Sequence, residues 1–230
     1  MSGVLSAISL DAISILTDGA VYDRDGVLLA IRRKVKVSDR LPLAVAFRGN
    51  FVFGEVTAHQ IISAAEAVGF DRTLADLEAD LPNMPASPDL EILIAGISES
   101  AGPMQRVFRN KQMGGFEPHT LVDPGPMHWG LGSDGRAISL ASIGIPAPRK
   151  DETVHTWLSR YGVNVFEFFR LIAVPLDPDD ENTSRQHLVG GLLDLTVIKP
   201  GSVSTTLLHR WPDKVGEKID PFRHDAREAA

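Results

Sequence analysis

Hydrophobic and polar positions alternate in two short runs at the start of the chain. Residues 4–10 and 12–17 show this alternation over part of their length, with Asp11 at the bend between them. A period of two is the spacing of a half-buried strand, so the runs predict a β-ribbon with Asp18 at its end. We also predict strands at residues 31–35, 89–97, 104–109, 191–198 and 203–210.

Helical spacing occurs in two pairs of segments. The apolar positions of residues 57–70 share one face of a helix, and Thr57 is placed to cap its first turn. A second helix is predicted at residues 72–81, immediately before three closely spaced prolines that would end it. The later pair is predicted at residues 152–160 and 163–172.

The order of these elements predicts an α+β protein with a mixed or antiparallel core. A chain of 230 residues with 43% hydrophobic content is long enough for one large domain, which we expect at residues 1–211. Residues 212–230 are rich in charge and poor in apolar side chains, so we expect them to form a C-terminal tail.

Composition excludes several classes of function. The formal net charge of −7 argues against nucleic acid as a partner, because binding to phosphates needs a basic surface. No stretch reaches the roughly 18–20 apolar residues of a membrane span, and the N-terminus lacks a signal-peptide pattern. We therefore expect a cytoplasmic protein with no membrane partner. The absence of cysteine excludes disulfides and thiolate nucleophiles.

Three polar residues near the N-terminus have the spacing of a candidate catalytic group. Ser2 directly follows Met1, and Asp18 and Lys34 follow it at equal steps of sixteen residues. Removal of Met1 would give Ser2 both a hydroxyl nucleophile and a free α-amine to act as its base. Lys34 could keep that amine neutral, and Asp18 could balance the lysine charge.

Two other patterns are weaker candidates for chemistry. Residues 130–135 match the dinucleotide pattern G-x-G-x-x-G, but they follow Pro-Gly-Pro rather than a hydrophobic strand, so they predict a turn. His119, Asp123 and His128 could be drawn together as metal ligands, although their spacing matches no zinc signature. We expect neither a cofactor nor a metal.

Residues 2–49 resemble the N-terminal portion of the proteasome β-subunit family, which includes bacterial proteasome-like peptidases. This family belongs to the N-terminal-nucleophile (Ntn) hydrolases. Without a gap, Ser2 falls on the family's N-terminal threonine, Asp18 on its aspartate and Lys34 on its lysine. The dipeptide Arg48-Gly49 falls on its Gly-Gly oxyanion turn. The resemblance therefore implies five catalytic positions.

Later segments extend the resemblance over most of the chain. Residues 91–96 resemble the family's central strand, and residues 189–198 resemble its late Gly-Gly strand. The resemblance implies a four-layer αββα sandwich that cleaves peptide or amide bonds. It also implies a homo-oligomer, with an unfoldase or another regulator as a further partner.

The chain departs from the family pattern around the catalytic positions. A supporting aspartate of the family would fall on Gln186, and supporting serines would fall on Val189 and near Ile145. Ser2 also lacks the methyl group that restricts a threonine rotamer. Two classes of function therefore remain: an Ntn peptidase or amidase, and a noncatalytic protein that keeps the fold for assembly or binding.

Overall fold

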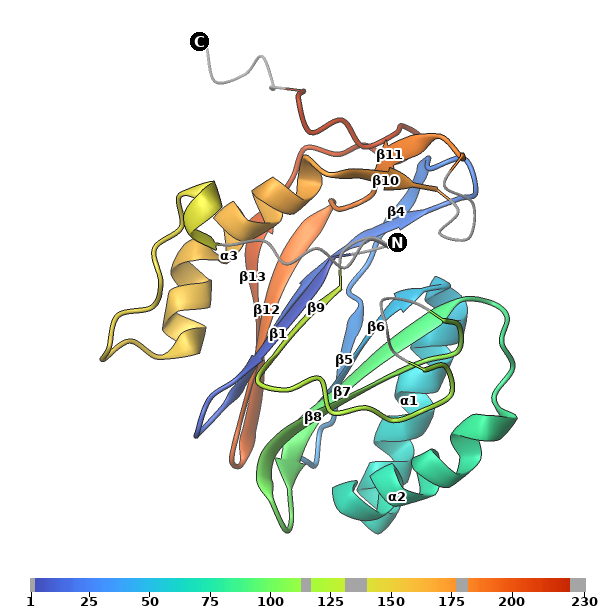
Figure 1. The fold of residues 1–230 in the computed structure, drawn as a ribbon, viewed down its shortest axis with the longest axis vertical. Helices are drawn as coiled ribbons and strands as arrows, with labels where there is room; N and C mark the ends of the chain where they lie inside the picture. The colour runs from blue at the N-terminus through green and yellow to red at the C-terminus, as the bar shows by residue number, and fades with distance from the viewer. Residues whose placement is uncertain (1–2, 113–116, 131–139, 177–181, 224–230) are drawn as a thin grey trace.

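The computed structural model describes residues 3–112, 117–130, 140–176 and 182–223. Over these residues the chain is a mixed α+β protein built from antiparallel sheets. Two large sheets face each other, and helices cover their outer sides (Figure 1). The predicted α+β class with an antiparallel core is confirmed.

The first large sheet has the strand order β13-β12-β2-β1-β9. Its strands are β1 (Val4–Ile8), β2 (Ile13–Asp18), β9 (Met127–Gly130), β12 (Leu192–Lys199) and β13 (Ser202–Arg210). Strands β1 and β2 form the predicted ribbon, with Val4 opposite Thr17. Strand β9 was not predicted from the sequence, because it is short and lies in a segment rich in glycine and proline.

The second large sheet has the strand order β5-β6-β7-β8. Its strands are β5 (Val35–Val37), β6 (Leu43–Gly49), β7 (Leu90–Ser98) and β8 (Gly102–Arg109). Strands β6 and β7 pair antiparallel, with Arg48 opposite Glu91. Strand β5 begins one residue after Lys34, so the predicted strand at residues 31–35 is interrupted at residues 32–34.

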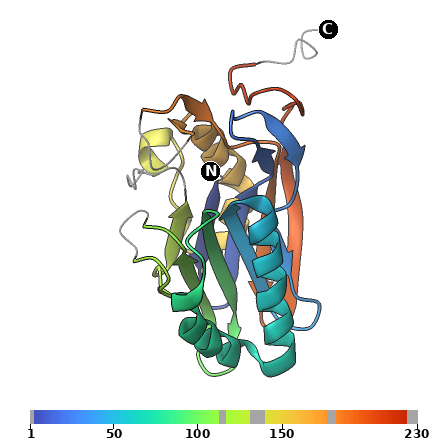
Figure 2. The same ribbon diagram turned by 90° about the vertical axis from the view of Figure 1, so that its right-hand side faces the viewer.

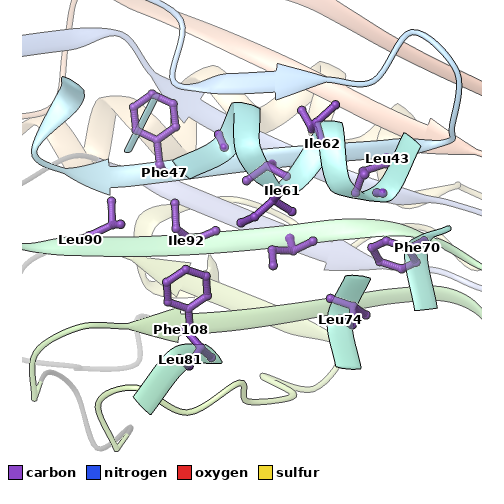
Figure 3. Close-up of a cluster of buried hydrophobic side chains, with 14 residues drawn as sticks. Leu43, Phe47, Ile61, Ile62, Phe70, Leu74, Leu81, Leu90, Ile92 and Phe108 are labelled. Carbon is purple, nitrogen blue, oxygen red and sulfur yellow. The ribbon is translucent and has the colours of Figure 1, made fainter. Parts of the chain in front are cut away.

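Helices α1 (Phe51–Val68) and α2 (Phe70–Asp80) lie over the outer face of this second sheet, and the short 3₁₀ helix η1 (Leu81–Asn83) follows them (Figure 2). The cluster between helices and sheet includes Phe47, Ile61, Ile92 and Phe108 (Figure 3). Gly54 allows α1 to approach closely, since a Cβ atom there would lie 2.3 Å from the Phe47 ring.

The predicted start of the first helix at Thr57 is wrong. Helix α1 begins at Phe51, and Asn50 caps it by accepting a hydrogen bond from the Phe53 N–H at 3.0 Å. Thr57 is a buried residue inside the helix. Val52 in the first turn is apolar but 70% exposed, so the apolar positions there do not follow the helical period and the pattern places the cap too late.

Helix α3 (Val154–Arg170) covers the outer face of the first sheet, after the 3₁₀ helix η2 (Leu140–Ile143). The prediction of two helices at residues 152–160 and 163–172 is wrong, because α3 runs through both. Gly162 lies within α3 against Leu16, and a Cβ atom there would be 2.9 Å from Leu16 Cδ1. This glycine therefore permits close packing rather than ending the helix.

The space between the two sheets is mostly apolar and also holds buried polar groups. Ile13, Ile15, Ala44 and Leu93 are among the buried residues of this layer. A hydrogen bond of 2.7 Å from the Ser6 hydroxyl to Gln105 Oε1 also joins the sheets. Such a bond satisfies both polar groups where water is excluded.

Two short ribbons and the end of the described chain complete the fold. The ribbons pair β3 (Ala20–Tyr22) with β4 (Leu28–Ile31), and β10 (Ala173–Pro175) with β11 (Arg185–His187). Residues 211–219 run beside the first ribbon, where Val27 bridges to Lys218 and Ile219 packs on Leu28. The prediction of a tail is therefore wrong for residues 212–219, which pack against the rest of the chain.

Candidate functional site

The Asp18 carboxylate is the centre of the candidate site. It lies at the last residue of β2, as predicted, and its side chain is fully buried. Three backbone N–H groups donate to it: Gly3 at 2.9 Å, Ala20 at 3.1 Å and Gly190 at 3.1 Å. A carboxylate with this many donors is held in one orientation.

Lys34 supplies the fourth donor to Asp18. Its Nζ atom lies 3.1 Å from Asp18 Oδ1, and only 4% of the lysine side chain is exposed. Burial lowers the pKa of Lys34 below its ordinary value, because it disfavours the charged amine. Asp18 opposes that shift, and the positive charge of Arg48 adds to it. The amine is therefore easier to deprotonate than a surface lysine.

The Arg48-Gly49 turn lies at the end of β6, next to this pair. Gly49 has a φ of 99°, and a Cβ atom there would lie 2.2 Å from the Asp89 carbonyl oxygen. Only glycine fits this conformation and this contact. Leu90, which stands opposite Gly49, directs its N–H and its C=O to Asn110. The backbone groups of Gly49 therefore point to the other edge of β6, which carries Lys34.

A pocket of about 240 Å³ is lined by Lys34 and by the Arg48-Gly49 turn. Its floor and walls come from β3, β4, the end of β6 and the start of α1. The remaining lining residues are Ala20, Val21, Tyr22, Leu29, Phe47, Asn50, Phe51 and Val52. A mostly apolar lining with one lysine and one strand-end turn suits a small group that carries a polar carbonyl.

The structure brings four of the five predicted site residues together. Asp18, Lys34, Arg48 and Gly49 all lie at one end of the two large sheets. Ser2, the fifth, lies outside the described residues, as does Met1. Gly3 is the first described residue, and its N–H is fixed by Asp18.

The Arg48 side chain joins a buried charge cluster that sequence reasoning missed. Its Nε atom lies 2.7 Å from Glu91 Oε1, and Glu91 also contacts Arg109 and, at 3.3 Å, His128 Nε2. Burial alone would raise the pKa of Glu91, but the positive charges of Arg48 and Arg109 and the His128 hydrogen bond hold it far below the ordinary value. These residues come from four different strands, so no local pattern connects them.

The positions expected to support the site carry neither a carboxylate nor a hydroxyl. Gln186, in β11, donates to the Ser184 hydroxyl at 3.1 Å. Val189 and Ile145 are buried apolar residues of the cluster under α3. The backbone of the neighbouring Gly190 contacts Asp18 instead. Part of the support therefore comes from main-chain groups, which a search for polar side chains does not find.

The three residues considered as metal ligands have structural partners in the described chain. His119 Nδ1 lies 3.0 Å from the Leu81 carbonyl, Asp123 pairs with Arg106, and His128 contacts Glu91. Among the described residues, no group of three His, Cys, Asp or Glu side chains is arranged to hold a metal ion. Most of the glycine-rich segment 130–135 lies outside the described residues.

Comparison with known proteins assigns no family. No protein-family model matches the chain, and no curated protein is significantly similar to it. None of the helices in the described ranges is both long enough and apolar enough to cross a membrane. The geometry of the site is therefore the basis for a functional interpretation.

Proposed function

We propose that the chain is an Ntn hydrolase of the proteasome-like kind, with Ser2 as nucleophile after removal of Met1. The observation that carries this proposal is the buried Asp18–Lys34 pair, because Asp18 also accepts the N–H of Gly3. A peptide bond joins Ser2 to the Gly3 nitrogen. The α-amine of a mature Ser2 would therefore be one residue along the chain from the N–H that Asp18 accepts. In this proposal the two facing sheets and their outer helices form a four-layer αββα sandwich.

The proposed reaction uses the two groups of Ser2. Its hydroxyl oxygen attacks the carbonyl carbon of a peptide or amide, and its α-amine takes the hydroxyl proton. The carbon–nitrogen bond then breaks, the leaving amine receives that proton, and the acyl group stays on the Ser2 oxygen. Water hydrolyses this ester and restores the hydroxyl. A cationic Lys34 keeps the α-amine neutral by charge repulsion, and Asp18 balances the lysine charge.

The oxyanion is assigned to the backbone of the Arg48-Gly49 turn. The direction of the ladder hydrogen bonds favours the Gly49 N–H over that of Arg48. Gly49 directs its backbone groups toward the edge of β6 that faces Lys34. A preorganised N–H at this point stabilises negative charge as it develops on the carbonyl oxygen. The pocket beside the turn, with Val21, Leu29 and Phe47 in its walls, favours substrates with an apolar group next to the cleaved bond.

The test is hydrolysis of fluorogenic peptide amides by the purified full chain, with intact mass measured on the same sample. We expect turnover only in material that has lost Met1, and Ser2→Ala should reduce kcat on the order of a thousandfold or more. Ser63→Ala, on the exposed side of α1, is the matched control and should retain activity. Unchanged turnover in Ser2→Ala would eliminate Ser2 as the nucleophile.

A noncatalytic protein with the same fold is the second candidate. It is favoured by the apolar Val189 and by the uncharged Gln186, at positions where the resemblance expects a serine and an aspartate. In that case the Asp18–Lys34 pair is a structural ion pair. Complete retention of Met1 in the native protein would favour this second candidate, because an acylated nitrogen cannot act as a base.

We further propose that the chain acts as a closed homo-oligomer on peptide or amide substrates, with an unfoldase or similar regulator as a further partner. Either candidate function is compatible with such an assembly. An enclosed arrangement would keep a general peptidase site away from folded proteins.

A further inference from the structure

Arg170 and Asp213 form a buried ion pair behind the candidate site. Arg170 is the last residue of α3, and its Nη1 and Nη2 atoms lie 2.8 and 3.0 Å from the two Asp213 oxygens. Both side chains are at least 95% buried. The guanidinium also lies over the Trp211 ring, 4.7 Å from its centroid. This bidentate geometry fixes residues 211–213 against α3.

The ion pair holds the loop that supports Asp18. Asp213 accepts the Gly191 N–H at 2.7 Å, and Arg170 donates to the Val189 carbonyl at 3.0 Å. Gly190, between these two residues, donates its own N–H to Asp18 at 3.1 Å. A continuous chain of hydrogen bonds therefore runs from Asp213 through the loop to the Asp18 carboxylate.

Contact at Gly190 leaves no space for the loop to shift toward the ion pair. A Cβ atom on Gly190 would lie 2.4 Å from Asp213 Oδ2 and 2.6 Å from Arg170 Nη1. The loop, the arginine and the carboxylate thus form one packed unit. Displacement of any part would move the Gly190 N–H relative to Asp18.

Residues 211–219 also hold a wall of the pocket. Gly216 donates to the Leu28 carbonyl at 2.8 Å, and Leu28 donates back to the Glu217 carbonyl at 2.9 Å. Ile219 packs on Ala20 and Leu28. The β3–β4 ribbon held in this way carries Ala20, Val21, Tyr22 and Leu29 of the pocket.

We propose that residues 211–219 position the candidate site through their contacts with the 189–191 loop and the β3–β4 ribbon. Arg170 and Asp213 are the positioning residues. They act through the loop at residues 189–191 on Asp18, and through Asp18 on Lys34. The catalytic consequence rests on the proposed function, whereas the mechanical coupling to Lys34 does not. Removal of the ion pair should loosen the loop, admit water and free an oxygen of Asp18 for Lys34.

The coupling can be tested by titrating Lys34 in the intact chain. The signal is the ¹³Cε resonance of labelled lysine, identified by its loss in Lys34→Arg. Asp213→Asn removes a negative charge, Arg170→Gln removes a positive charge, and Gly190→Ala separates the pair without changing charge. Loosening should raise the titration midpoint of Lys34 by at least about half a pH unit in all three variants, because hydration favours the charged amine.

If the charges of Arg170 and Asp213 acted on Lys34 directly, the three variants would shift its titration midpoint in a different pattern. Such a direct effect would lower the midpoint in Asp213→Asn, raise it in Arg170→Gln and leave Gly190→Ala unchanged. That pattern, or unchanged midpoints in the folded variants, would overturn the proposal. Gly190→Ala retains both charges, so it remains available if a charge variant does not fold. Ile61→Val, in the cluster under α1, is a control for general destabilisation and should not shift Lys34.

The readout separates this proposal from the proposed function. If the chain hydrolyses no amide, the Lys34 midpoints still decide whether the ion pair positions Asp18. If it does hydrolyse amides, the same variants should lower kcat in proportion to the change in the Lys34 midpoint. Active variants with an unchanged Lys34 midpoint would contradict the coupling while leaving the hydrolase assignment in place.

Discussion

Arg48 and Glu91 form an ion pair with 5% and 3% of their side chains exposed, and their closest atoms are 2.7 Å apart. The backbone of Arg48 belongs to the turn beside the pocket, whereas its guanidinium lies in the interior of the fold. A Cβ atom on Gly130 of β9 would lie 2.7 Å from the Arg48 Cζ atom. The candidate oxyanion turn is thus anchored to both large sheets.

The first prediction concerns the Glu91 carboxylate. Glu91→Gln keeps the shape of the side chain but removes the negative charge that faces the buried Arg48 and Arg109. We expect the free energy of unfolding to fall by roughly 3–5 kcal/mol, the range for breaking a buried ion pair. Urea denaturation at neutral pH measures this change. Asp76→Asn, which breaks the exposed Arg72–Asp76 pair, should change stability by less than about 1 kcal/mol.

The same carboxylate should make the protein sensitive to acid. The pKa of Glu91 is depressed in the folded state, so on acidification the unfolded chain takes up the proton first. The stabilisation is complete above the unfolded glutamate pKa of about 4.3 and declines as pH falls below it. Glu91→Gln should therefore show a smaller loss of stability between about pH 5 and pH 2 than the parent chain. Equal losses in the two proteins would contradict this prediction.

The second prediction concerns assembly and derives from the resemblance to proteasome-like subunits. The purified chain should form a closed, symmetric homo-oligomer at micromolar concentration. Multi-angle light scattering measures its mass directly across a dilution series. A single species near the chain mass of 24.9 kDa at every concentration would contradict the prediction and weaken the peptidase proposal.

Local sequence patterns predicted the elements whose neighbours lie close in the chain. The N-terminal ribbon is an example, because β1 and β2 pair across a short turn and share one alternation. Helix boundaries were less accurate, since they depend on single contacts. Asn50 caps α1 several residues before the start of the predicted helix at Thr57, and Gly162 packs within α3 where a break was expected.

The candidate site was predicted only where spacing and resemblance gave a signal. Asp18 and Lys34 meet as expected, but the cluster around Glu91 unites residues from four strands and has no pattern of its own. Residues 212–219 were assigned to a tail because they are highly charged. The burial of Asp213 depends on Arg170, more than forty residues away, so composition alone could not predict it.

The third prediction concerns Gly49. Gly49→Ala should lower the free energy of unfolding by roughly 1–3 kcal/mol, because alanine is strained at a φ of 99° and would contact the Asp89 carbonyl. Gly102→Ala is a matched control, since Gly102 has a φ of 77° with open space around its Cβ position. We expect a smaller loss there. If the chain is a hydrolase, only Gly49→Ala should also lower kcat, because it displaces the N–H assigned to the oxyanion.

The last prediction concerns Lys34, whose pKa is lowered in the folded state mainly by burial. Between that lowered pKa and the ordinary lysine value of about 10.4, the unfolded chain binds more protons than the folded chain. Lys34 should therefore add stability as pH rises through this interval, by up to about 1.4 kcal/mol for each pH unit that separates the two pKa values. Lys34→Met should lose that alkaline increment, while Lys150→Met, at an exposed position, should retain it. Urea denaturation from about pH 7 to pH 10.5 measures the free energy of unfolding of each protein. If the free energies of the parent and Lys34→Met change with pH in parallel, burial does not lower the pKa of this amine.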